Sequence, residues 1–210
     1  SPLTFEVLEE GVRFGELSGG AFDVTVGPLV DLWRQAGRGN TPPTDEALAE
    51  ARAKTGVEKL ILDDEEMSVE FAVEGMRVDL GGIAKGFAID KSIEAMQRRG
   101  ALGGMVDIGG DVRCFGVAPR GQEYWRIGLQ DPNVGEEEFG GKPLLVLHVK
   151  DAAVTTSGDY RRFTRVRGER QSHILDRRTG EGAAKLVSVT IIASEATAAD
   201  ALATAVSVLG

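Results

Sequence analysis

Cysteine is nearly absent from this sequence, and basic residues are fewer than acidic ones. Cys114 is the only cysteine among 210 residues, which excludes an internal disulfide and a metal centre built from several thiolates. Lysine and arginine number 24 against 33 aspartate and glutamate residues, a formal net charge of −9. This balance gives no general attraction for nucleic acid or anionic lipid, so we expect no nucleic-acid partner, although a local basic pocket is compatible with it.

Long apolar runs are also missing. No segment approaches the ~20 consecutive apolar residues that a membrane-spanning helix needs, so we expect no transmembrane segment. The hydrophobic fraction of 42% nevertheless excludes wholesale disorder. A chain of this length fits one domain with a substantial core. We expect any export signal or lipid anchor to lie outside this sequence.

Glycine, by contrast, is abundant. The 28 glycines are about twice the number expected from a usual share of ~7%. They occur without an internal repeat or a low-complexity tract. Because glycine permits tight turns and close approach of the backbone to other groups, the excess indicates a fold with many such positions.

Apolar spacing and turn residues predict short strands between helices. Helices near both ends around many turn-linked strands are typical of an α+β fold with a largely antiparallel sheet and packed helices. The expected helices are residues 1–17, 29–35, 45–54, 83–100 and an alanine-rich helix near the C-terminus. The expected strands are 76–80, 105–108, 112–115, 124–129, 144–149, 163–166, 173–175 and 187–193, together with a hairpin around an acidic turn at 63–66.

The segment from Val78 to Gly86 is the first that indicates chemistry. Its paired glycines, Gly81 and Gly82, lie between a predicted strand and a predicted helix, where free backbone N–H groups and the positive end of the helix dipole favour an anion. Lys85 adds a full charge in the first turn, so phosphate is the natural ligand. The segment is neither a Walker A loop nor a GxGxxG fingerprint, and a plain strand-to-helix turn is the alternative interpretation.

A second segment places two carboxylates, Asp107 and Asp111, around the glycine pair Gly109 and Gly110. Glycine pairs at the end of a strand allow a ligand or a neighbouring backbone to come close. A simple turn between strands 105–108 and 112–115 explains the pattern equally well.

The third region comprises residues 154–160 and 172–180. Its small hydroxyl residues followed by glycine can donate hydrogen bonds to an anion or a heterocycle. Of the two histidines, His148 lies in an alternating apolar run and is interpreted as structural. His173 lies where a strand meets a polar turn, a better position for a general base, with a structural role as the alternative.

The fourth segment contains Asp200 and Thr204. A spacing of four places them on one helix face, where a carboxylate and a hydroxyl can share a hard cation such as Mg2+. The alternative is a capping box, Thr197-x-x-Asp200, which needs no metal.

Together these segments resemble the ApbE-like FAD:protein FMN transferases. The match is specific because five modest motifs follow one another in the family's order. The resemblance implies a T-fold-like α+β domain that binds FAD and Mg2+ and moves FMN onto a threonine or serine hydroxyl of another protein, releasing AMP. The matching segments are residues 20–30, 78–86, 156–158, 172–180 and 199–204.

The resemblance also implies roles for individual residues. It assigns Mg2+ to Asp200, Thr204 and the backbone carbonyl of Ala84, and the pyrophosphate to Lys85 with the Gly81–Gly82 turn. His173 matches the candidate base, which would draw the proton from the incoming hydroxyl as it attacks the FMN-side phosphorus. The other expected cofactor-binding residues are Asp79, Gly109, Gly110, Thr156, Ser157 and Gly158.

Three readings of this resemblance stay open. The leading one is transfer to an acceptor protein that carries an Asp/Ser-Gly-Ala-Thr/Ser motif. An FAD pyrophosphatase would use the same site with water as the nucleophile, releasing FMN and AMP. A non-catalytic FAD-binding module would release no AMP.

The chain departs from the family pattern in two ways. Arg177 stands where the family often has proline after His-x-x-Asp, so the shape of that turn is open. The family usually has further elements before residue 1 and after Gly210. We therefore expect residues 1–210 to be a partial transferase domain without its N- and C-terminal elements. The compartment is undetermined, and the resemblance favours a bacterial periplasmic protein or membrane-anchored lipoprotein.

Overall fold

The computed structural model describes residues 1–134, 141–158 and 163–210. Its helices are α1 (Pro2–Leu17), α2 (Gly27–Gly39), α3 (Asp45–Ala53), α4 (Ala84–Arg98) and α5 (Ala196–Leu209), with 3-10 turns at Val57–Lys59 and Pro119–Gly121. The strands are β1 (Leu60–Asp63), β2 (Ser68–Phe71), β3 (Gly103–Ile108), β4 (Asp111–Gly116), β5 (Trp125–Leu129), β6 (Leu145–Val149), β7 (Ala153–Gly158), β8 (Phe163–Val166), β9 (Glu169–Ser172), β10 (Leu175–Asp176), β11 (Glu181–Gly182) and β12 (Ser188–Ala193).

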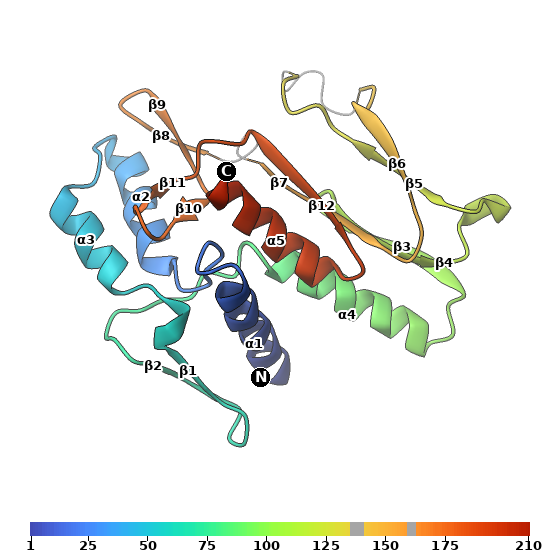
Figure 1. The fold of residues 1–210 in the computed structure, drawn as a ribbon, viewed down its shortest axis with the longest axis horizontal. Coiled ribbons are helices and arrows are strands. Elements are labelled where there is room, and N and C mark those ends of the chain that lie inside the picture. Colours follow the sequence, from blue (N-terminus) through green and yellow to red (C-terminus); the bar gives the residue numbers. More distant parts are fainter. Residues whose placement is uncertain (135–140, 159–162) are drawn as a thin grey trace.

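A four-stranded antiparallel sheet in the order β12-β7-β4-β3 forms the centre of the fold. α4 and α5 lie next to each other along one face of this sheet (Figure 1). Ile89 and Ile93 of α4 pack with Ala196 and Ala199 of α5 and with Phe115 of β4. Each fully buried isoleucine contributes about 1.5–3 kcal/mol, so this interface holds the two helices firmly on the sheet.

The hairpin of β5 and β6 covers the opposite face of the sheet. Successive side chains of a strand point to opposite faces, so Val112 and Cys114 of β4 face away from Phe115. They pack with Val154 and with Trp125 of the hairpin. Burial raises the pKa of the Cys114 thiol, which keeps it protonated and unreactive at neutral pH.

Gly86 lets α4 and α5 approach closely. A Cβ at this position would overlap the backbone of Ala196 and Thr197. We expect Gly86→Ala to destabilise the protein by about 1–3 kcal/mol through overpacking. Gly39→Ala is the control, because a Cβ there meets no atom within 4 Å. Thermal unfolding should show a lower Tm for Gly86→Ala alone, and equal Tm values for the two variants would contradict this close packing.

A second core joins the N-terminal part to α5. Leu8 and Phe14 of α1 pack in one cluster with Phe22, Ile83 and Ala201. α1 and α5 therefore enclose residues 20–25 and the segment that leads into α4. Ile174 belongs to the same cluster, whereas Leu175 packs in a separate cluster with Leu29 of α2 and Ala51 of α3.

The predicted α+β class and antiparallel pairing are confirmed, because every pairing between strands in the described residues is antiparallel. The hairpin around the acidic turn is confirmed as β1 and β2. Thr44 caps α3 by accepting a hydrogen bond from the N–H of Ala47 at 3.2 Å, as its position before the acidic first turn predicts. None of the helices among the described residues has the length and apolarity needed to cross a membrane.

Two predicted strands are wrong. Residues 76–80 make one isolated parallel bridge, between Arg77 and Val26, and their apolar alternation instead places Val78 and Leu80 against the core. In the predicted strand 173–175, only Leu175 is in a strand, because His173 and Ile174 form a bend after β9. Residues 159 and 160 of the third sequence segment lie outside the described residues.

Candidate active site

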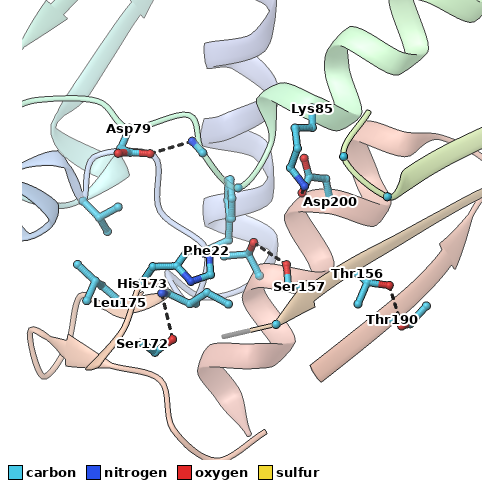
Figure 2. Close-up of a pocket in the computed structure, with 18 of the residues that line it drawn as sticks. Phe22, Asp79, Lys85, Thr156, Ser157, Ser172, His173, Leu175, Thr190 and Asp200 are labelled. Carbon is cyan, nitrogen blue, oxygen red and sulfur yellow. Dashed lines mark hydrogen bonds and ion pairs between the residues drawn. The ribbon is translucent and has the colours of Figure 1, made fainter. Parts of the chain in front are cut away.

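A cavity of about 550 Å³ opens where α5, the N-terminus of α4, the β3–β4 turn and the segment after β9 meet. Figure 2 shows this pocket, with His173 and Phe22 on one side of the view and Lys85 and Asp200 on the other. Of the predicted site residues, Ala84 does not line the cavity. Those that do are Asp79, Gly81, Gly82, Lys85, Gly109, Gly110, Thr156, Ser157, Gly158, His173, Asp200 and Thr204.

Asp200 is a buried carboxylate near the N-terminus of α5. The residue is 3% exposed, and its Oδ2 accepts a hydrogen bond of 3.0 Å from the N–H of Gly86 in the first turn of α4. Burial raises the pKa of Asp200 to about 6, although Lys85 and the Gly86 N–H act in the opposite direction. The surrounding protein therefore leaves the negative charge of Asp200 incompletely compensated.

Lys85 lies between two carboxylates. Its ammonium group is paired with Asp111 and lies 4.0 Å from Oδ1 of Asp200. Asp111 is buried, and its other oxygen accepts a hydrogen bond of 2.9 Å from the N–H of Thr156. Sequence analysis left both a turn and a ligand-facing role open for the segment that contains Asp111, and the structure pairs this carboxylate with Lys85. Its position directly after the Gly109–Gly110 pair was the only sequence signal for it.

Thr204 lies one helical turn after Asp200, as the spacing of four predicts. Its Oγ1 is 3.4 Å from Oγ of Ser157 on β7. A Cβ at Gly82 would lie 2.9 Å from the same oxygen of Thr204, so a side chain at position 82 would obstruct this corner of the cavity.

The capping-box interpretation of Thr197 and Asp200 is wrong. α5 begins after Glu195, which makes no side-chain capping hydrogen bond, and Asp90 of α4 binds its first N–H groups instead. The carboxylate of Asp90 accepts hydrogen bonds from the N–H of Ala196 at 2.9 Å and from the N–H of Thr197 at 2.8 Å. Asp90 thereby joins α4 to the helix that carries Asp200. Sequence reasoning missed it because its partners lie over a hundred residues away.

The free N–H groups expected at the Gly81–Gly82 turn are mostly occupied. The N–H of Gly81 donates to Oδ1 of Asp79 at 2.8 Å, and those of Ile83 and Ala84 donate to the carbonyl of Leu80. By accepting this hydrogen bond, Asp79 stabilises a tight turn, as aspartate often does. The positive charge at this end of α4 therefore comes mainly from Lys85.

The Gly109–Gly110 pair is both a turn and part of the cavity wall. It joins β3 to β4 with φ values of 67° and 94°, which favour glycine. The N–H of Gly110 donates to Oδ1 of Asp107 at 2.9 Å. The turn interpretation is confirmed, and the turn lines the cavity. The ligand-facing role stays a prediction.

His173 lies on an exposed bend between two buried residues, Ser172 and Ile174. The N–H of Ile174 donates to Oγ of Ser172 at 3.2 Å, which tightens the bend. The buried neighbours fix the backbone, while the imidazole lines the cavity. His148 does not line the cavity and stacks on Tyr124, consistent with its structural interpretation.

Apolar side chains line the rest of the cavity. Phe22, Val26, Trp33, Ile127 and Leu129 are among them. An apolar wall with a few convergent polar groups suits a ligand that carries both a flat heterocycle and phosphate.

The donor set near Asp200 fits Mg2+. A carboxylate and the hydroxyl of Thr204 are the hard oxygen ligands this ion prefers, and Ala84 lies in the turn whose Gly86 N–H contacts Asp200. The raised pKa of Asp200 marks a charge that a cation would compensate. Among the described residues no three His, Cys, Asp or Glu side chains group as a metal site. Such a sparse set agrees with the way Mg2+ combines one or two carboxylates with phosphate oxygens and water.

Comparisons with known proteins point the same way. The ApbE family model matches residues 1–210. The FAD:protein FMN transferase of Vibrio cholerae is 38% identical over 213 residues, which cover 100% of this chain and 62% of that protein. The FAD:protein FMN transferase of Treponema pallidum is 37% identical over 219 residues, which cover 98% of this chain and 59% of that protein.

Solved structures share the fold. The ApbE protein of Thermotoga maritima superposes with a TM-score of 0.84 at 40% identity, over 98% of this chain and 65% of that one. The flavinyl transferase ApbE of Pseudomonas stutzeri, in its apo form, gives 0.83 at 32% identity, over 100% and 64%. This chain thus spans about three fifths of the length of the curated relatives it matches.

Proposed function

The chain belongs to the ApbE family, and we therefore propose that it transfers FMN from FAD to a threonine or serine hydroxyl of an acceptor protein and releases AMP. One observation carries the proposal: a single cavity collects a buried carboxylate (Asp200), an ammonium group (Lys85) and an imidazole (His173). A metal ligand, a cation for phosphate and a proton acceptor are three groups that accelerate transfer of a phosphoryl group. We further propose that residues 1–210 belong to one transferase domain.

The residues of the cavity divide between binding and proton transfer. Asp200, Thr204 and the Ala84 carbonyl would hold Mg2+, which when bound supplies positive charge to phosphate oxygens. Lys85 would exchange part of its pairing with Asp111 for a pyrophosphate oxygen. The glycine turns and the 156–158 segment would lie along the nucleotide, together with Asp79.

Proton transfer is assigned to His173. The acceptor hydroxyl would approach the FMN-side phosphorus from the open side of the bend, and the imidazole would accept its proton as the new O–P bond forms. The bond from that phosphorus to the bridging oxygen breaks, and AMP leaves with this oxygen. The atoms balance as FAD plus acceptor hydroxyl giving FMN-acceptor ester plus AMP and one proton.

Mass spectrometry tests the proposal. The protein is incubated with FAD and Mg2+, with and without an acceptor carrying an Asp/Ser-Gly-Ala-Thr/Ser motif. We expect in-gel flavin fluorescence on the acceptor, a covalent FMN adduct at its hydroxyl residue, and one AMP per adduct. Free FMN with AMP and no adduct would instead indicate hydrolysis. Bound FAD without AMP, at any Mg2+ concentration, would indicate a binding module.

A further inference from the structure

Arg177 ties the bend that carries His173 to two distant parts of the chain. Its Nε lies 3.3 Å from Oδ2 of Asp23, and its Nη1 lies 3.3 Å from both carboxylate oxygens of Glu58. Asp23 follows the turn after α1, and Glu58 precedes β1. One guanidinium group thus links three segments that are far apart in sequence.

The guanidinium group of Arg177 packs closely against the backbone of another segment. It packs over Gly20, where a Cβ would lie 2.6 Å from Nη2 of Arg177. Gly20 also has a φ of +80°, whereas its neighbour Gly19, at +60°, has no atom within 4 Å of the position of a Cβ. Only position 20 therefore combines the turn conformation with a contact to Arg177.

The partner of Arg177 is part of the cavity wall. The side chain of Asp23 is 1% exposed and lines the cavity. Its Oδ1 accepts hydrogen bonds from the N–H and the hydroxyl of Thr25 at 2.7 and 2.6 Å. Oγ1 of Thr25 accepts a hydrogen bond of 2.6 Å from the N–H of Gly56. Arg177 thus forms an ion pair with a carboxylate that belongs to a buried hydrogen-bonded network.

Arg178 offers a natural contrast. Its side chain is 53% exposed and pairs at 2.8 Å with Asp176, two residues away. This ion pair links two neighbouring residues and does not connect the turn to a distant segment. Two adjacent arginines therefore have the same charge, but one fixes the turn to the cavity wall and the other does not.

We propose that Arg177 is a positioning residue that holds the His173 bend against the Asp23 wall of the cavity. The proposal rests on the role proposed above for His173 as the base. Three residues lie between His173 and Arg177, and two of them, Leu175 and Asp176, form β10, so a displacement of the guanidinium end moves the bend. A displacement of about 1 Å at a reacting group can cost ~10²-fold in rate.

Steady-state kinetics of Arg177→Gln and Arg178→Gln test the proposal. We expect Arg177→Gln to lower the kcat of FMN transfer about tenfold or more, with the KM for FAD within about threefold of wild type, because the base moves and the nucleotide contacts stay. Arg178→Gln should stay within about twofold of wild type. Arg177→Lys, which keeps one charge but loses the two-armed geometry, should fall between them. Equal kcat values for Arg177→Gln and Arg178→Gln would overturn the proposal.

A second readout does not depend on activity. The sequence has two histidines, so NMR spectra of histidine-labelled protein contain two imidazole signals, with His148 as the internal reference. We expect Arg177→Gln to shift or broaden the His173 signal and leave His148 unchanged, and Arg178→Gln to change neither. A His173 signal that superposes on wild type in Arg177→Gln refutes the positioning role. If wild type transfers no FMN but the His173 signal responds, the proposed function fails and the positioning role stands.

Three further variants guard against misfolding. Glu58→Gln removes one arm of the ion pair at a side chain that is 58% exposed, so folding is retained, and we expect a smaller shift of the His173 signal in the same direction. Gly20→Ala displaces the guanidinium group and should reproduce Arg177→Gln, whereas Gly19→Ala carries similar backbone strain without the contact. Identical spectra for the two glycine variants would count against the proposal.

Discussion

Asp200→Asn is expected to abolish FMN transfer and, without metal, to stabilise the protein at neutral pH. Loss of the carboxylate removes the charged ligand for Mg2+, and a metal ion supplies several kcal/mol of stabilisation to a phosphoryl transition state, so the rate should fall ~10³-fold or more. Residual activity should no longer depend on Mg2+. Product formation from FAD and acceptor, measured across a Mg2+ titration, gives both results.

The stability gain follows from the sign of the pKa shift. The pKa of Asp200 is raised from 3.8 to about 6 by burial, so the folded protein holds this proton more tightly than the unfolded chain. The resulting stabilisation is fully present below about pH 4 and is lost as the pH rises through about 6, a change of about 3 kcal/mol. Asparagine does not titrate, so the metal-free variant should be more stable than wild type above this range.

Urea unfolding with EDTA and with Mg2+ at several pH values checks this linkage. The difference between wild type and Asp200→Asn should grow from pH 4 to pH 6 and stay constant above. Mg2+ should stabilise wild type at pH 7.5 and leave the variant unchanged. Asp63→Asn, at the exposed β1–β2 turn, is the control and should match wild type in every condition. Full activity in Asp200→Asn would remove the metal assignment.

Local sequence patterns predicted the elements of the fold and most of the cavity lining. The helix starting near residue 84 and the helix with Asp200 and Thr204 are confirmed because their apolar spacing and glycine boundaries are local signals. The contact between the N-terminal parts of these two helices could not be predicted from local patterns. The contact between Gly86 and Asp200 spans 114 residues and depends on the packing of α4 against α5.

The residues that sequence reasoning missed share one feature. Asp90 and Asp23 are buried carboxylates whose partners are distant in sequence. In the sequence each looks like an ordinary acidic residue of a helix or turn. Only the fold shows that Asp90 caps α5 and that Asp111 holds Lys85. The prediction of free N–H groups at Gly81 is wrong for the opposite reason. The side chain of Asp79, only two residues away, accepts a hydrogen bond from the N–H of Gly81.

The cavity explains part of the glycine excess. Gly81, Gly82, Gly109, Gly110 and Gly158 all line it. At Gly82 a side chain would meet Thr204, and at Gly109 and Gly110 the positive φ values favour glycine. Part of the excess therefore reflects a cavity surface formed from backbone turns. The excess was visible in the sequence, whereas the positions of the turns in space were not.

His173→Ala is expected to lower kcat about 10²-fold or more at neutral pH, with little change in the affinity for FAD. Removal of the imidazole leaves the acceptor hydroxyl without a positioned proton acceptor. The buried neighbours Ser172 and Ile174 keep the bend in place, so the nucleotide contacts should persist. Single-turnover measurements with preformed protein–FAD complex separate this chemical step from binding and from AMP release.

His148→Ala is the matched control for this prediction. His148 is exposed on β6, stacks on Tyr124 and does not line the cavity, so its loss should leave the single-turnover rate unchanged. A base differs from a residue that only shapes the pocket in its effect on FAD binding. If His173 only shaped the pocket, its removal would weaken FAD binding together with the rate, whereas loss of a base lowers the rate alone. An unchanged rate in His173→Ala would make His173 structural and would require another proton acceptor in the cavity.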